Sequence, residues 1–128
     1  MTSSRVTDYG LLTFLNQDPD IQALQVQNKD GDWIDAAPPP GALIVNIGDM
    51  SHKMTSGIYK STNHRVVHNG ASDRISVPFF YECNFDAVVE PVGTAEQQRR
   101  GLESYGTDRT EACYGWHLVN KINSNFAY

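Results

Sequence analysis

Four polar side chains in this sequence are of types that could hold a metal ion and a small anion together. They are Asp8, His64, Arg74 and Ser76. Carboxylate and imidazole are the ligands of oxygen-activating Fe(II) sites, which keep open positions for cosubstrate and O₂. Arg74 and Ser76 are two residues apart, so in a strand both side chains point to one face. There the planar guanidinium and the hydroxyl form a cradle for a carboxylate.

Each of these residues also has an ordinary structural interpretation when it is taken alone. An aspartate before Tyr-Gly is usually a turn or capping residue. A lone histidine in an extended segment is usually structural, and this holds for His52, His68 and His117 as well as for His64. In a regular strand His68 would lie about 13 Å beyond His64, too far to share one metal ion. Only the combination indicates a metal centre beside an anchor for a dicarboxylate.

The elements that must carry these residues are short and mostly extended. Apolar, β-branched and aromatic runs predict strands at 9–15, 21–27, 33–36, 42–47, 58–68 and 74–82. Turn-forming residues separate several of them, as in the Asp-Gly hairpin signal within 28–32. Residues 48–57 predict one short helical turn or a loop. Pro78 places its strand at an edge, a bulge or an end. This spacing favours a sandwich or barrel over a parallel α/β sheet.

The chain becomes polar and then helical in character after Pro91. A helix packed on the outside of the sheet is predicted near the C-terminus. The apolar residues expected to line one of its faces are Cys113, Trp116, Leu118, Val119 and Ile122, with Phe126 near the end.

Composition excludes several classes of partner. The chain has 128 residues and a net charge of −5, and Arg99-Arg100 is its longest basic cluster, so neither nucleic acid nor an anionic membrane is an expected partner. No apolar run approaches the roughly 20 residues of a membrane helix, and residues 1–10 do not resemble a secretory signal. A cytoplasmic location is therefore expected. Cys83 and Cys113 are interpreted as free buried thiols, with a disulfide as the alternative.

The sequence resembles the iron(II)- and 2-oxoglutarate-dependent oxygenases of the isopenicillin N synthase-like class. The resemblance rests on TDYGLLTFL, NIGDM, STNHRVVH and DRISVPFF, in that order, and extends from about Thr7 to Phe126. It implies a mainly β fold, a double-stranded β-helix (jelly roll) that is incomplete at its N-terminus, with a C-terminal helix. It also implies a single partial domain over 1–128, the C-terminal catalytic half of such an enzyme. The jelly-roll core would span about 6–91 and the helical tail about 95–126.

The resemblance also implies a role for each candidate residue. His64 matches the iron-binding histidine of the H-R-V segment, and Asp8 matches the aspartate of the H-x-D motif. Arg74 and Ser76 match the R-x-S that grips the remote carboxylate of 2-oxoglutarate. The implied cofactor is Fe(II), with 2-oxoglutarate as cosubstrate. The implied partners are O₂ and a small organic substrate, which would be hydroxylated or desaturated.

One position departs from the family pattern. Val6 stands where H-x-D has its first histidine, and neither Arg5 nor Thr7 replaces that ligand. Metal affinity is therefore expected to fall. Three interpretations follow: an oxygenase or a piece of one, a non-catalytic dicarboxylate-binding or scaffold module, or a remnant without function. An incomplete jelly roll would also expose strand edges, which predicts self-association.

Overall fold

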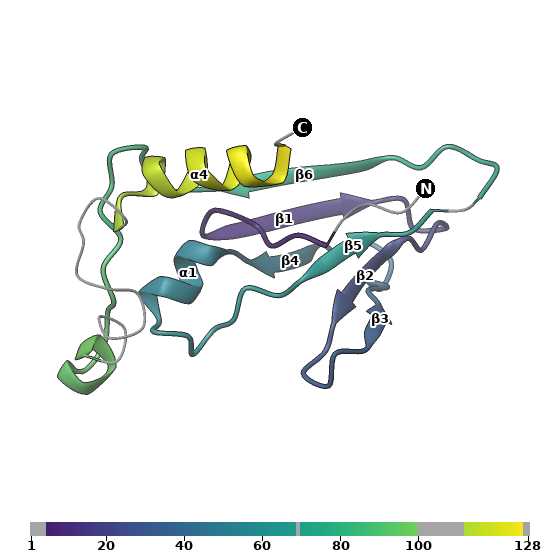
Figure 1. Ribbon diagram of the computed structural model, residues 1–128. Helices are drawn as coiled ribbons and strands as arrows, with labels where there is room; N and C mark the ends of the chain where they lie inside the picture. The colour runs from purple at the N-terminus through teal and green to yellow at the C-terminus, as the bar shows by residue number, and fades with distance from the viewer. Residues whose placement is uncertain (1–4, 69, 100–111, 127–128) are drawn as a thin grey trace.

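The computed structural model describes residues 5–68, 70–99 and 112–126, and its strands form two three-stranded antiparallel sheets (Figure 1). The first sheet has the order β4-β1-β6, built from Ile44–Ile47, Leu12–Gln17 and Ser76–Tyr81. Phe14 in its central strand pairs with Val45 on one side and Phe79 on the other. Within the described residues β6 is an edge strand, which is where the proline inside it was expected.

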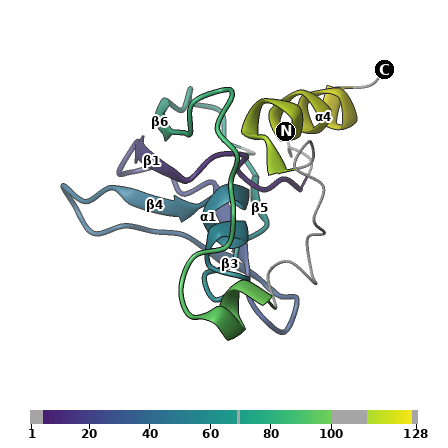
Figure 2. The same ribbon diagram turned by 90° about the vertical axis from the view of Figure 1, so that its left-hand side faces the viewer.

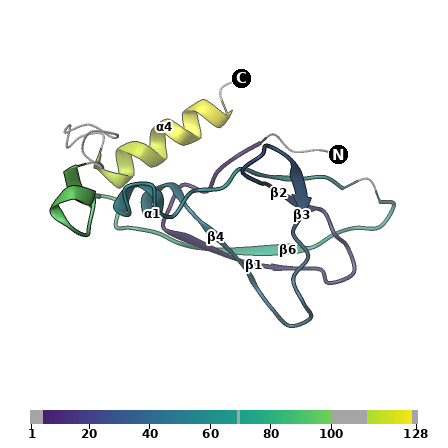
Figure 3. The same cartoon turned by 90° about the horizontal axis from the view of Figure 1, so that it is seen from below.

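The second sheet has the order β3-β2-β5, built from Trp33–Asp35, Leu24–Gln27 and His64–Val66. The hairpin between β2 and β3 turns at Gly31, whose φ of 91° suits glycine. The Asn28 side-chain oxygen accepts hydrogen bonds from the backbone N–H groups of Asp30 and Asp32. Figure 3 shows the β2–β3 hairpin on one side of the molecule and β1, β4 and β6 on the other. The predicted mainly β class is confirmed.

The two faces of the first sheet differ in environment. Thr13 is buried on the face of β1 opposite to that of Phe14. The end of β1 reaches the second sheet, because Gln17 Nε2 donates to the carbonyl of Ala36 at 3.4 Å. On the opposite face Val45 is 51% exposed and Phe79 is 64% exposed. Around Val45 and Phe79 this sheet therefore presents an exposed apolar outer face in the described part of the chain.

A small core lies where α1 (Asp49–Met54) and α4 (Tyr114–Phe126) meet the sheets. Helix α1 follows β4, and α4 lies at one side of the molecule (Figure 2). Met50, Val89 and Tyr114 are the buried residues of this cluster. The partly buried residues around them are Leu11, Met54, Cys83 and Leu118. The short helix expected within 48–57 is thus present as α1.

The face that α4 turns to the protein differs from the predicted one. Trp116, Val119 and Ile122 are exposed, whereas Tyr114 is buried and Leu118 packs against the core. The reason is that polar side chains of α4 have partners on the sheet side, so ion pairs and hydrogen bonds orient this helix. Phe126 was expected near the end of the apolar face, but its side chain lies outside the described part of the structure. Residues 100–111 of the expected tail also lie outside the described part.

Some predicted strand limits were wrong. The first strand begins at Leu12 and continues through Gln17, although residues 16–20 had the composition of a turn. The predicted extended run at 58–68 contains only the three-residue strand His64–Val66. Cys83 and Cys113 are free, as expected, but half-buried rather than buried. No helix among the described residues has both the length and the apolar character needed to cross a bilayer.

Candidate functional site

Val6 and Asp8, near the start of the chain, lie beside His64, which is far from them in the sequence. Val6 donates its N–H to the His64 carbonyl at 3.1 Å, and His64 donates to the Val6 carbonyl at 3.0 Å. Residues paired in this way across antiparallel strands direct their side chains to the same face. The structure therefore brings the His64 ring, the Val6 side chain and, two residues further on, Asp8 together. A cavity of about 230 Å³ adjoins Val6 and Asp8, with Phe80 and Glu82 on its other side.

Asp8 and His64 approach each other without sharing a good hydrogen bond. Asp8 Oδ1 lies 3.6 Å from His64 Nε2, and both side chains are almost buried. His64 Nδ1 lies 3.2 Å from the Thr62 carbonyl, which only accepts, so Nδ1 carries the proton in this contact. Nε2 is therefore the ring nitrogen directed at the carboxylate. Asp8 Oδ2 is buried with no hydrogen-bond partner among the described residues. A carboxylate and an imidazole nitrogen directed at the same space are both groups that can bind a metal ion.

An apolar side chain stands at the position where a third metal ligand would be expected beside Asp8 and His64. Val6 stands beside His64 and Asp8 and has no donor atom for a metal. Across the described ranges, no group of three or more His, Cys, Asp or Glu residues could together hold a metal ion. The residues present therefore fit a divalent cation held by two protein ligands, with water or another ligand at the remaining positions.

Arg74 and Ser76, which were predicted to form a carboxylate cradle, lie side by side at the start of β6. Arg74 Nη1 donates to Ser76 Oγ at 3.2 Å, and Nη2 donates to Gln17 Oε1 at 3.1 Å. Arg74 Nε is buried with no hydrogen-bond partner in the described structure, and no described carboxylate pairs with this guanidinium. Its positive charge is thus oriented by neutral groups and remains available to an anion. In the described part of the chain, no direct contact joins this pair to Asp8 or His64.

Gln17 is a component of the cradle that the sequence reasoning missed. It is the register partner of Ser76 at the end of β1, and its side chain links Arg74 to the Ala36 carbonyl of the second sheet. The amide therefore holds the guanidinium between the two sheets. The available signal was weak, because Gln17 lies in a stretch whose composition is that of a turn.

Helix α4 holds the segment that carries Asp8. Lys121 Nζ donates to Thr7 Oγ1 at 2.9 Å and pairs with Asp49 Oδ2 at 2.9 Å. The Asp49 backbone N–H in turn donates to the Asp8 carbonyl at 2.8 Å. Asn125 Nδ2 of α4 also donates to the Tyr9 hydroxyl at 2.7 Å. The residues before and after Asp8 in the chain are therefore both bound to α4.

Asp49 is held in its charged form. Burial raises the pKa of its carboxyl, but the contacts with His117 and with the Lys121 ammonium outweigh burial, so the pKa lies well below its usual range. His117 Nε2 is 3.3 Å from Asp49 Oδ2. These contacts come from polar positions of α4, which a search for an apolar helix face does not identify.

The family model of the 2OG-Fe(II) oxygenase superfamily matches residues 2–82, which is more than half of the chain. The chain belongs to this superfamily. It is 51% identical over 121 residues to homoarginine-6-hydroxylase 2-ODD-C23.1 of Arabidopsis thaliana, a match covering 94% of this chain and 36% of that protein. It is 52% identical over 120 residues to homoarginine-6-hydroxylase 2-ODD-233 of Oryza sativa subsp. japonica, covering 94% and 35%. The chain thus spans about a third of these curated relatives.

Solved oxygenase structures share the fold. Full-length Neurospora crassa T7H in complex with alpha-KG and thymine superposes with a TM-score of 0.72 at 28% identity, covering 96% of this chain and 37% of that one. JOX2 in complex with 2OG, Fe and JA gives a TM-score of 0.67 at 36% identity, covering 73% and 28%. The predicted family, jelly-roll fold and family cofactors, Fe(II) and 2-oxoglutarate, are therefore confirmed for the class to which this oxygenase chain belongs.

Proposed function

We propose that residues 1–128 form one partial domain of a 2OG-Fe(II) oxygenase, and that the protein oxidises a small organic molecule with O₂ as cosubstrate. The observation that carries the proposal is the convergence of Asp8 Oδ1 and His64 Nε2 to 3.6 Å, with Asp8 Oδ2 unpartnered among the described residues. A carboxylate and an imidazole nitrogen directed at one space are the types of ligand that bind Fe(II).

Each polar group of the site has a distinct role in this proposal. Asp8 and His64 would hold Fe(II), and the Thr62 carbonyl would keep the His64 ring in the tautomer that binds. Arg74, oriented by Ser76 and Gln17, would bind the remote carboxylate of 2-oxoglutarate. When bound, the iron supplies the oxidising chemistry that converts 2-oxoglutarate to succinate and CO₂ and hydroxylates or desaturates the substrate.

The names of four relatives indicate which substrate to test first. Each of them is 49–52% identical to this chain and is named a homoarginine-6-hydroxylase. Homoarginine is therefore the first substrate to offer the protein together with Fe(II), ascorbate and 2-oxoglutarate. Succinate release that depends on homoarginine supports the proposal. His64→Ala should abolish that release, and full turnover in this variant contradicts the assignment.

A second candidate function is a non-catalytic module that binds a dicarboxylate or acts as a scaffold. The observation in its favour is that the Arg74 cradle is present while Val6 occupies the third metal position. Thermal unfolding separates the two functions. Stabilisation by 2-oxoglutarate in the presence of EDTA, with no succinate formed when Fe(II) is supplied, favours the binding module. Stabilisation that requires the metal favours the oxygenase.

A further inference from the structure

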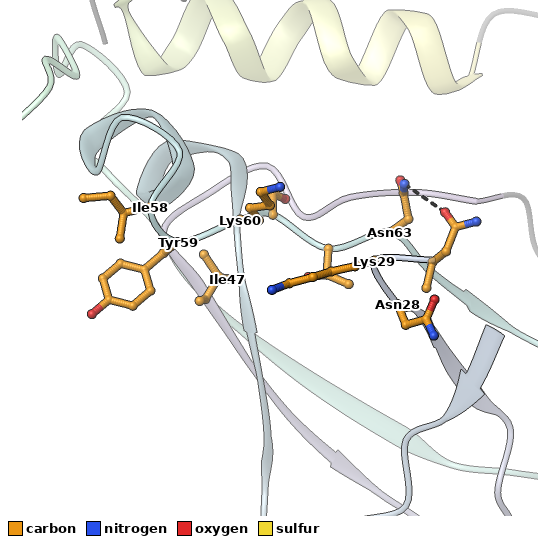
Figure 4. A pocket seen from close by; sticks show the side chains of 10 residues that line it. Asn28, Lys29, Ile47, Ile58, Tyr59, Lys60 and Asn63 are labelled. Atoms are coloured by element: carbon orange, nitrogen blue, oxygen red, sulfur yellow. Dashed lines mark hydrogen bonds between the residues drawn. The ribbon is translucent and has the colours of Figure 1, made fainter. Parts of the chain in front are cut away.

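A groove of about 680 Å³ lies apart from the cavity beside Val6 and Asp8 (Figure 4). It runs between the tip of the β2–β3 hairpin, the segment 58–63 and the end of β4 at Ile47. It shares no lining residue with the cavity beside Val6 and Asp8. Its volume falls within the roughly 300–1,000 Å³ typical of small-molecule sites. Neither the proposed metal ligands nor the Arg74 cradle uses it.

The groove lining is positively charged, whereas the protein as a whole is negatively charged. Lys29 and Lys60 both line it, and no aspartate or glutamate does. Neither lysine forms an ion pair or hydrogen bond with another residue of the described ranges. The whole chain carries a net charge of −5, so two unneutralised ammonium groups at one hollow oppose its overall balance. Such a pair favours an anionic ligand.

One end of the groove is apolar. Ile47, Ile58 and Tyr59 line it, and Ile58 and Tyr59 are 60% and 58% exposed. In Figure 4 the Lys29 side chain extends from the hairpin side toward Ile47. A ligand with a hydrocarbon body could therefore cover the apolar end while its charge meets the ammonium groups. Burial of this exposed apolar surface would favour binding.

The polar wall of the groove is held by hydrogen bonds. Asn63 Nδ2 donates to Gln27 Oε1 at 3.3 Å, and the Gln27 N–H donates to the Asn63 carbonyl at 2.9 Å. At the other end the Tyr59 N–H donates to Thr55 Oγ1 at 3.2 Å. Both walls are thus fixed before a ligand arrives, which lowers the entropic cost of binding.

We propose that this groove binds a small organic carboxylate with an apolar body, its carboxylate toward Lys29 and Lys60 and its hydrocarbon on Ile47, Ile58 and Tyr59. The site is separate from the oxygenase centre and does not depend on metal binding. It does adjoin that centre along the chain, because the Thr62 carbonyl that contacts His64 Nδ1 belongs to the groove wall.

The test is a titration of the ¹⁵N-labelled chain followed by ¹H–¹⁵N correlation spectra. The probes are 4-phenylbutyrate and its neutral analogue 4-phenyl-1-butanol, which share the apolar body. We expect saturable shifts of the amides at 27–29 and 58–63 with the acid and much weaker binding of the alcohol. In the double variant Lys29→Gln/Lys60→Gln the acid should bind roughly fivefold more weakly, because exposed ion pairs are individually modest.

The control is Lys53→Gln, which removes the same charge from α1 outside the groove lining and should leave the affinity unchanged. Three results would each overturn the proposal. They are equal binding of acid and alcohol, unchanged affinity in the double variant, and shifts confined to the exposed face of the first sheet around Phe14, Val45 and Phe79. Because Lys29 and Lys60 are exposed, the variants should fold normally.

Discussion

Val6 and His64 face each other in an antiparallel bridge with both backbone hydrogen bonds formed, at 3.1 and 3.0 Å. The backbone at position 6 therefore already directs its side chain to the face that carries the imidazole and the Asp8 carboxylate. A site with three metal ligands would therefore need only a different side chain at position 6, and the strand would not have to rearrange.

Val6→His is expected to create the third metal ligand. We expect the affinity for Co(II), a redox-stable substitute for Fe(II), to rise by more than about tenfold, or about 1.4 kcal/mol. Isothermal titration calorimetry measures the change, and the visible absorption of Co(II) reports its coordination. Val6→Ala is the control, because it removes bulk without adding a ligand. Equal affinity in Val6→His and Val6→Ala would show that position 6 does not reach the metal.

Arg74→Lys is expected to weaken 2-oxoglutarate binding although it keeps the charge. Lysine cannot reproduce the planar fork that reaches both Ser76 Oγ and Gln17 Oε1. We expect an increase in Kd of about tenfold, measured by calorimetry with 2-oxoglutarate. Arg65→Lys is a matched control, because Arg65 stacks 4.1 Å over the Trp33 ring and takes no part in the cradle. Equal losses in both variants would contradict a specific anchor at Arg74.

Asp49 should make the chain less stable in acid. Its pKa is lower in the folded chain than in the unfolded one, because its contacts with His117 and Lys121 outweigh the effect of burial. The stabilisation is therefore complete above the unfolded pKa, near 4, and is lost as the pH falls below that value. Urea unfolding at pH 6 and pH 3 should show a smaller loss of unfolding free energy in Asp49→Asn than in the parent. An identical loss of unfolding free energy in both proteins would show that Asp49 does not cause the acid sensitivity.

The sequence predicted the strands better than it predicted the surroundings of the candidate residues. Runs of apolar, β-branched and aromatic residues identify β1 and β6 because that signal is local, and the family motifs indicate Asp8, His64, Arg74 and Ser76 as candidates. The distance between Asp8 and His64 depends on the pairing of Val6 with His64, which are far apart in the chain, so no local pattern contains it.

The orientation of α4 was mispredicted for a related reason. Its apolar spacing favoured a buried face containing Trp116, whereas the contacts of Lys121 with Thr7 and Asp49 turn a partly polar face inward. A hydrophobic pattern counts apolar residues and does not register a long-range ion pair. Gln17 was missed in the same way, because its partners Arg74 and Ala36 lie in other elements.

Phe79→Asp should reduce self-association of the chain. Phe79, 64% exposed, lies with Phe14 and Val45 on the outer face of the first sheet, and its ring is 6.3 Å from that of Phe14. An exposed apolar sheet face of this kind promotes association between molecules. Sedimentation velocity over a range of concentrations should show a smaller rise in sedimentation coefficient for Phe79→Asp than for the parent.

Ile34→Asp is the control, because Ile34 is 49% exposed on the second sheet. A parent that remains monomeric at all concentrations would contradict the expectation, and equal suppression by both variants would attribute association to net charge alone.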